Sequence, residues 1–256
     1  MTAESRQSFH HVQQAVQKVF RKQREAARIL HKSVEDDEKN LSEAILAALA
    51  AEWADLPFEI QFSLESAALS GVNQGILQLE VSSSAVISSA NDIAHSYALD
   101  RAAELVGMKR DVEGNLVPNP DAQWAISNTT RDRIREIVAD AFTHDTPIAE
   151  IETAIQQALA DEAEGNGIFS DARAALIART EVSTAQVAGN FASWVKSGLV
   201  KRVKWLVSNL EPCPVCLLNE NQEVNLGEPF RSGDIRPPQH PNCACLLAVS
   251  ETNEPE

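Results

Sequence analysis

All four cysteines of the chain lie in one stretch near its C-terminal end. The stretch begins with Cys213-Pro214-Val215-Cys216 and closes with His240-Pro241-Asn242-Cys243-Ala244-Cys245. A Cys-x-x-Cys turn presents two thiolates from one tight loop, which is how a tetrahedral zinc site takes its first pair of ligands. A second Cys/His cluster further along completes a spacing signature that a lone Cys-x-x-Cys lacks. The sequence therefore predicts a zinc site that joins the two ends of the stretch.

Five side chains compete for the four positions of this site. The first choice is Cys213, Cys216, His240 and Cys243. Cys245 is the alternative ligand, because we expect one member of the Cys243/Cys245 pair to point away from the metal. Two other interpretations of the cysteines stay open, namely reduced thiols in a hydrophobic core and two disulfides in an oxidising compartment.

The same cysteines match half of a catalytic motif. Zinc deaminases combine such a Cys-x-x-Cys with an upstream His-x-Glu or Cys-x-Glu, whose glutamate is the general acid and base, and the chain has no such tripeptide. A zinc nuclease needs a histidine base beside its metal, and His240 is expected to be a ligand. Four protein ligands close a site and stabilise a fold, whereas a catalytic site keeps one position open. We predict a structural zinc site and no enzymatic activity; the alternative is a zinc-dependent nucleic-acid enzyme, nuclease- or deaminase-like.

Composition and periodicity favour helices over most of the chain. Apolar residues make up 44% of the sequence and aromatic residues only 5%. After Gly198 the period changes to two, with Val203, Trp205 and Val207 on one face of an expected strand. The predicted fold class is α+β and mostly α, with helical N-terminal and middle regions followed by a small zinc-pinned β-sheet at the C-terminus. No apolar run reaches the ~20 residues of a membrane span, and the N-terminus does not resemble a signal peptide, so we expect a reducing cytoplasm and no membrane contact.

Individual elements follow from the apolar spacing and from capping residues. We expect one helix over residues 8–32, a helix that opens at Pro57 and ends at Gly71, and a longer helix from about Asn73 to Val106 that is weakened at Ser82–Ser84. Further elements are a hairpin near 111–117, two helices between 134 and 159, a helix at 171–196 capped by Ser170, and short strands near 223–226 and 244–249.

Charge is distributed unevenly along the chain. The net charge is −15, yet residues 1–32 carry seven basic and two acidic side chains, whereas residues 33–169 carry seven basic and 25 acidic ones. DNA phosphates would repel such an acidic body, so only residues 1–32, the basic arm, are candidates for DNA contact. An apolar seam through Phe9, Val12, Val16 and Val19 could instead form a coiled coil, and a solvated basic face is a third interpretation. The candidate contacts to DNA or to an acidic partner are Lys18, Arg21, Lys22, Arg24 and Arg28.

Several motifs occur in an order that resembles a known family. They are Ile177-Ala178-Arg179-Thr180-Glu181, then Gly189-Asn190, then Ser197-Gly198 before a strand that reaches Trp205, and then the two Cys/His clusters. This succession resembles the phage Mu F-like minor head protein family, the head-morphogenesis domain of tailed bacteriophages. The resemblance covers roughly Trp124 to Val249. Ala244 stands where relatives commonly carry arginine.

The resemblance implies a structural minor head (capsid) protein, associated with the portal and acting in head assembly, DNA packaging or ejection. Its partners would be the portal protein, other head proteins and, through the basic arm, packaged DNA. It would be present in several copies in the virion, at the head or portal vertex, after assembly in the host cytoplasm. Arg179 and Glu181 are expected to anchor helix to sheet rather than to catalyse a reaction.

The predicted division of the chain follows these signals. Residues 1–32 form the basic arm, 33–123 an acidic helical region, 124–250 the head-morphogenesis domain with its zinc knuckle, and 251–256 a disordered acidic tail.

Overall fold

The computed structural model describes residues 3–29, 46–47, 49–132, 136, 167, 169–207 and 212–253. The predicted helices between 134 and 159 lie outside these residues, apart from position 136. The chain forms two compact units. The first comprises 1–9, 62–99 and 177–256, and the second comprises 10–61 and 100–176.

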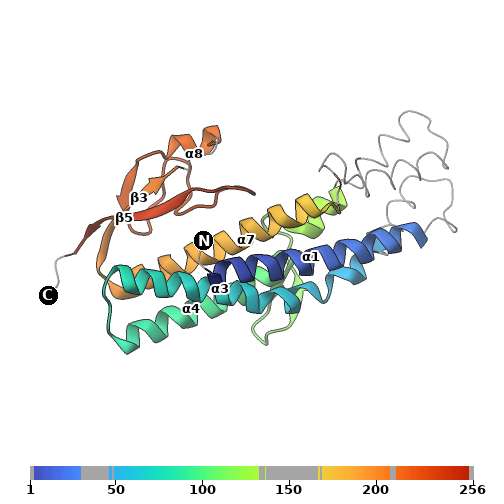
Figure 1. Ribbon diagram of the computed structural model, residues 1–256, viewed down its shortest axis with the longest axis horizontal. Helices are drawn as coiled ribbons and strands as arrows, with labels where there is room; N and C mark the ends of the chain where they lie inside the picture. The colour runs from blue at the N-terminus through green and yellow to red at the C-terminus, as the bar shows by residue number, and fades with distance from the viewer. Residues whose placement is uncertain are drawn as a thin grey trace. The chain divides into compact units, whose positions relative to one another are not determined.

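Most of the described chain is helical, as predicted, and the sheets are small and antiparallel (Figure 1). The elements in order are α1 (Ala3–Ile29), η2 (Ala51–Trp53), α3 (Leu56–Gln78), α4 (Ser84–Glu104), β1 (Met108–Arg110), β2 (Leu116–Pro118), α7 (Asp171–Ser197), β3 (Val200–Leu206), α8 (Pro214–Leu218), β4 (Glu223–Asn225) and β5 (Leu246–Thr252).

Helix α1 buries the apolar seam that the sequence predicts for it. Val12, Val16 and Val19 are at most 4% exposed. Phe20 meets Trp53 edge to face, with ring centroids 6.3 Å apart, and lies 5.3 Å from the ring of Phe169. Three of the four seam residues therefore pack within this chain, whereas Phe9 is half-buried.

One polar residue of α1 is also buried. Gln23 is 0% exposed and donates a hydrogen bond of 3.3 Å from Nε2 to the Leu49 carbonyl.

Two predicted helix boundaries in the first half of the chain need correction or refinement. The helix that begins near Pro57 does not end at Gly71, because α3 continues to Gln78. Gly71 lies inside the helix, where it allows close contact with α7 rather than terminating the turn. The predicted weakness at Ser82–Ser84 is confirmed as a full break: α3 has ended at Gln78 and α4 begins at Ser84.

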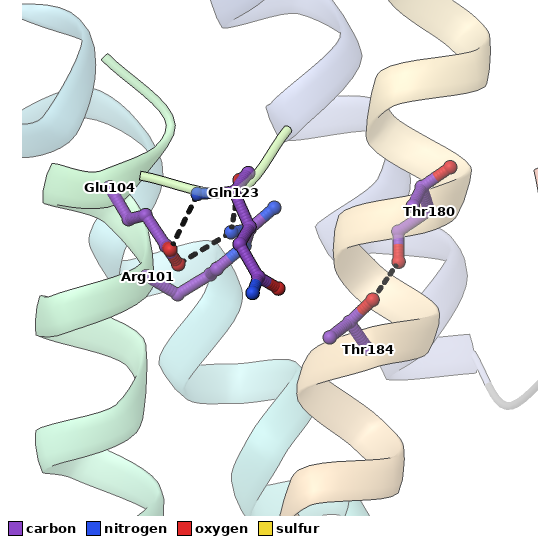
Figure 2. Close-up of polar contacts among 5 residues, drawn as sticks. All are labelled: Arg101, Glu104, Gln123, Thr180 and Thr184. Atoms are coloured by element: carbon purple, nitrogen blue, oxygen red, sulfur yellow. Dashed lines mark hydrogen bonds and ion pairs between the residues drawn. The ribbon is translucent and has the colours of Figure 1, made fainter. Parts of the chain in front are cut away.

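A polar cluster fixes the chain that follows α4. Arg101, which is 6% exposed, donates from Nη1 to Glu104 Oε2 (2.6 Å) and to the Gln123 carbonyl (3.1 Å). The Gln123 amide in turn donates to Glu104 Oε1 at 2.9 Å (Figure 2). Between these residues lies the predicted hairpin, in which β1 pairs with β2. Its turn is held by the Asp111 carboxylate, which accepts bonds from the amides of Glu113 and Asn115.

Helices α3 and α7 cross at very short range within the first unit. A Cβ atom added at Gly71 would overlap the Gln186 carbonyl oxygen, and one added at Gly189 would overlap the Ala68 carbonyl oxygen. The two contacts are reciprocal, since each glycine faces the backbone of the other helix. Glycine is therefore required at both positions by space, not by an unusual backbone conformation.

The C-terminal sheet has the strand order β4-β3-β5 and both pairings are antiparallel. Val203 and Trp205 of β3 are fully buried, which confirms the predicted strand face. The predicted disordered tail is wrong at its start, because β5 extends to Thr252. Glu251 lies in this strand and pairs with Lys201 Nζ at 2.6 Å, an ion pair that favours the strand over a solvated tail.

Candidate metal centre

The first two candidate ligands lie at the start of the short helix α8. Cys213 is its N-cap, Pro214 occupies the first turn, and the Cys216 amide donates to Cys213 Sγ at 3.4 Å. Proline suits this place because the first helical amides have no carbonyl partner in the helix. The local sequence thus turns both sulfur atoms toward one point.

His240 approaches the same two sulfur atoms. Its Nε2 lies 3.1 Å from Cys213 Sγ and 3.4 Å from Cys216 Sγ. Its Nδ1 lies 2.8 Å from the Pro241 carbonyl oxygen. A carbonyl only accepts hydrogen bonds, so Nδ1 carries the proton and the Nε2 lone pair is directed to the sulfur atoms. Metal-bound histidines are oriented in this way by a second hydrogen bond.

Cys243 and Cys245 complete the cluster around Cys216. The donor atoms of Cys213, Cys216 and His240 lie within 4.8 Å of one another, and so do those of Cys216, Cys243 and Cys245. Our expectation that one cysteine of the Cys243/Cys245 pair points away is therefore wrong. Residues two apart in an extended chain face the same side, and both thiols come to Cys216.

Two of the donor spacings match those of a tetrahedral zinc ion, whereas Cys213 Sγ and His240 Nε2, at 3.1 Å, lie closer than two ligands of one zinc would. With Zn–S bonds of about 2.3 Å, two thiolates on one zinc lie about 3.8 Å apart, and a thiolate and an imidazole nitrogen about 3.6 Å apart. Cys216 and Cys243 are separated by 3.7 Å between sulfur atoms, and Cys216 and His240 by 3.4 Å. A donor set of thiolates with one imidazole also suits zinc by its softness.

The cluster is largely closed to solvent. Cys216, Cys243 and Cys245 are 1%, 5% and 2% exposed. Burial raises the pKa of Cys216 and of Cys243 above the ordinary thiol value, and hydrogen bonds to Cys243 from the amides of Cys245 and Gln239 offset only part of this effect. Burial opposes ionisation of Cys213 as well, but hydrogen bonds from Cys216 bring its pKa below the ordinary value. A divalent cation would supply the missing compensation and hold all of the thiols as thiolates.

A hydrophobic core surrounds the sulfur atoms. Cys216, Cys243 and Cys245 pack in one cluster with Val203 and with Trp205, whose ring meets that of Phe230 edge to face at 5.0 Å. The predicted link between the metal site and the sheet is thus visible in the packing. The candidate metal ligands and the sheet residues share the same core, so loss of the buried sulfur atoms would also weaken the packing of the sheet.

The loop that carries His240 and Cys243 is also attached to the helices of the first unit. The Asn242 amide donates to Thr180 Oγ1, and Arg179 Nη1 donates to Asn242 Oδ1, both at 2.9 Å. Arg236 lies over the rings of Tyr97 and Phe191, at 6.0 and 5.3 Å from their centroids.

Sequence reasoning did not foresee these attachments. Thr180 belongs to the motif at 177–181 and Asn242 to the Cys/His cluster at 240–245, but spacing along the chain does not reveal that these two motifs are in contact. Arg179 was expected to join helix to sheet. It instead joins helix α7 to the loop that carries His240 and Cys243. Glu181 is buried, at 3% exposure.

The candidate DNA contacts of the basic arm are partly engaged within the chain. Lys18 forms an ion pair with Glu59, and Lys22 Nζ lies 3.3 Å from Glu52 Oε2. Arg21 is exposed and Arg24 is half-buried, while the side chain of Arg28 lies outside the described residues. DNA binding by these residues stays a prediction, and a smaller part of the arm's charge is available for it than the sequence suggests.

Comparisons with protein-family models, with curated proteins and with solved structures give no match for this chain. Within the described residues, no helix combines the length and the apolar character needed to cross a membrane.

If the cluster is a zinc site, protein purified under reducing conditions without added metal should contain about one zinc per chain. The two donor groups share Cys216 and together contain five residues. Five donors are enough for one four-coordinate ion but not for two, so one equivalent is expected. Elemental analysis of the purified protein measures this ratio. Protein that carries no metal as purified and also binds none on titration would contradict the zinc site.

Proposed function

We propose that the chain is a structural minor head protein of a tailed bacteriophage, whose C-terminal region is held together by a zinc ion bound to Cys213, Cys216, His240 and Cys243 or Cys245. The proposed role is assembly and interaction at the portal vertex during head assembly, DNA packaging or ejection. Zinc serves the fold and takes no part in a reaction.

The observation that carries the structural role of the metal is the closure of the donor cluster. Three of its five donors are at most 5% exposed, and they pack in the same core as the sheet residue Trp205. A catalytic zinc needs a position open to water and a general base beside it. Here five protein donors lie in two overlapping groups that share Cys216, which is enough to fill four tetrahedral positions without water.

The assignment to phage heads is supported by the way the family-like motifs fit together. Arg179 and Thr180 of the first motif bind Asn242 of the last one. Gly189 of the second motif is the glycine that lets α7 approach α3. Motifs far apart in sequence thus belong to one structural unit, as expected if they mark one domain type rather than chance matches.

The portal association can be tested by co-expression. We expect the chain to co-purify with the portal protein of the same phage and to be incorporated into procapsids. The surface that binds should depend on the intact C-terminal region, so Cys216→Ser should lower co-purification, whereas the exposed neighbour substitution Val215→Ser should not. A chain that is absent from both the portal complex and the procapsids would refute the proposed function, whatever its zinc content.

A further inference from the structure

The ligands His240 and Cys243 are the two ends of a tight turn. The Cys243 amide donates to the His240 carbonyl at 3.1 Å, the hydrogen bond that closes a four-residue turn. Pro241 and Asn242 are the central residues. Asn242 has a φ of 63°, which lies in the left-handed region. Proline followed by a residue of positive φ is the pattern of a type II turn, in which the third position accepts glycine or asparagine.

The left-handed residue decides how the two ligands are directed. A type I turn, with a negative φ at Asn242, would also bring Cys243 back to His240, but the peptide between Pro241 and Asn242 would be turned over and the chain would leave toward Cys243 in another orientation. Asparagine tolerates this conformation better than most residues with a side chain, but the conformation still costs free energy. Contacts that hold Asn242 in place therefore act on both ligands at once.

Two neighbouring residues of α7 supply such contacts. Thr180 Oγ1 accepts the Asn242 amide at 2.9 Å, and Arg179 Nη1 donates to the Asn242 side-chain oxygen at 2.9 Å. The backbone and the side chain of the corner residue are thus both bound. Thr180 is 3% exposed, so water does not readily replace its hydroxyl as the acceptor.

We infer that Thr180 and Arg179 are positioning residues of the metal centre, which hold Asn242 at the corner of the His240–Cys243 turn and so set the direction of two metal ligands. This inference rests on the proposed zinc site, and it assigns the Arg-Thr pair of α7 a task in metal binding. The two residues touch no donor atom in the described contacts. They act through the turn, as the partners of ligating residues do in other metal sites.

The test compares zinc affinity in the full-length chain, measured by competition with a chromogenic chelator. Thr180→Val keeps the shape of the side chain but removes the acceptor, and loss of an outer-shell partner typically costs about 10-fold or more in metal affinity. Thr180→Ser keeps the hydroxyl and should retain the wild-type affinity. Arg179→Gln, at an exposed position, should weaken binding by a smaller factor of roughly 3, below the range for buried partners.

Thr184→Val is the matched control. Thr184 lies one turn further along α7, and its hydroxyl donates to the Thr180 carbonyl at 2.7 Å (Figure 2). The substitution removes a hydroxyl from the same helix without touching the turn at Asn242. Its zinc affinity should equal that of the wild type. Cobalt-substituted protein provides the second readout: because ligand directions set the geometry of the cobalt site, its absorption bands should shift in Thr180→Val and keep their positions in Thr184→Val.

The outcomes separate this inference from the zinc site itself. If the wild type binds neither zinc nor cobalt, the zinc site fails and the inference fails with it. If the wild type binds zinc and Thr180→Val binds it equally well, the positioning role is wrong and the zinc site stands. The positioning role would also be overturned if Thr180→Val lowered the thermal stability of the metal-free and the zinc-bound protein equally and left the zinc affinity unchanged. Should Thr180→Val not fold, Arg179→Gln decides: wild-type affinity in that variant overturns the inference.

Discussion

Replacement of Cys216 by serine is expected to abolish zinc binding and to unfold the C-terminal sheet. Cys216 is the one donor that belongs to both groups of close donor atoms, so its loss disrupts the site whichever of Cys243 and Cys245 is the fourth ligand. Its sulfur is also part of the core that contains Trp205. Structural zinc in isolated zinc-finger peptides contributes about 10–16 kcal/mol to folding, which is comparable with the whole stability of a typical domain, about 5–15 kcal/mol.

The effect of Cys216→Ser can be followed with zinc content, thermal unfolding and tryptophan fluorescence, since Trp194 and Trp205 lie in the same buried cluster as the cysteines. Leu218→Ser is the control, because Leu218 lies on the same helix and is 54% exposed. That variant should keep its zinc and its melting temperature. A Cys216→Ser protein that still binds one zinc and melts as the wild type does would show that the sheet is held by apolar packing alone.

Local signals in the sequence were sufficient to predict several elements of the fold. The change of apolar period after Gly198 placed β3 and its buried face correctly, since Val203 and Trp205 are both fully buried. Ser170 was recognised as a cap, and its Oγ accepts the Arg173 amide at 3.2 Å at the start of α7. These features depend on residues close in sequence, where propensity and periodicity carry the information.

Features that depend on distant contacts could not be read in the same way. Gly71 appeared to end a helix because glycine is a common C-terminal signal. The structure uses it for space against Gln186, a residue more than a hundred positions away. The basic face of α1 appeared available for DNA, but Lys18 and Lys22 meet acidic residues of α3 and η2. The turn at Asn242 was likewise visible only as a motif, because its partner Thr180 lies on another element.

The crossing of α3 and α7 leads to the second large expected effect. Gly189→Ala should destabilise the first unit by about 2 kcal/mol or more, which lowers the melting temperature by roughly 5 °C. In an isolated helix, glycine to alanine would stabilise the helix by about 1 kcal/mol. The sign of the change in stability therefore tests whether Gly189 is in contact with α3. The added Cβ would overlap the Ala68 carbonyl oxygen and approach the Val72 amide, and backbone atoms cannot move away unless the helices separate.

Gly75→Ala provides the matched comparison, because it makes the same chemical change at the same crossing against a different kind of neighbour. Its Cβ would overlap Ser193 Oγ, a side-chain atom, instead of the backbone. Gly75→Ala should therefore cost less than Gly189→Ala, and the double variant Gly75→Ala/Ser193→Ala should recover part of the loss. No truncation of a side chain can rescue Gly189→Ala in this way. Thermal unfolding of the wild type and the three variants measures this order of stability. A Gly189→Ala variant more stable than the wild type would mean that α3 and α7 do not approach as closely as the structure shows.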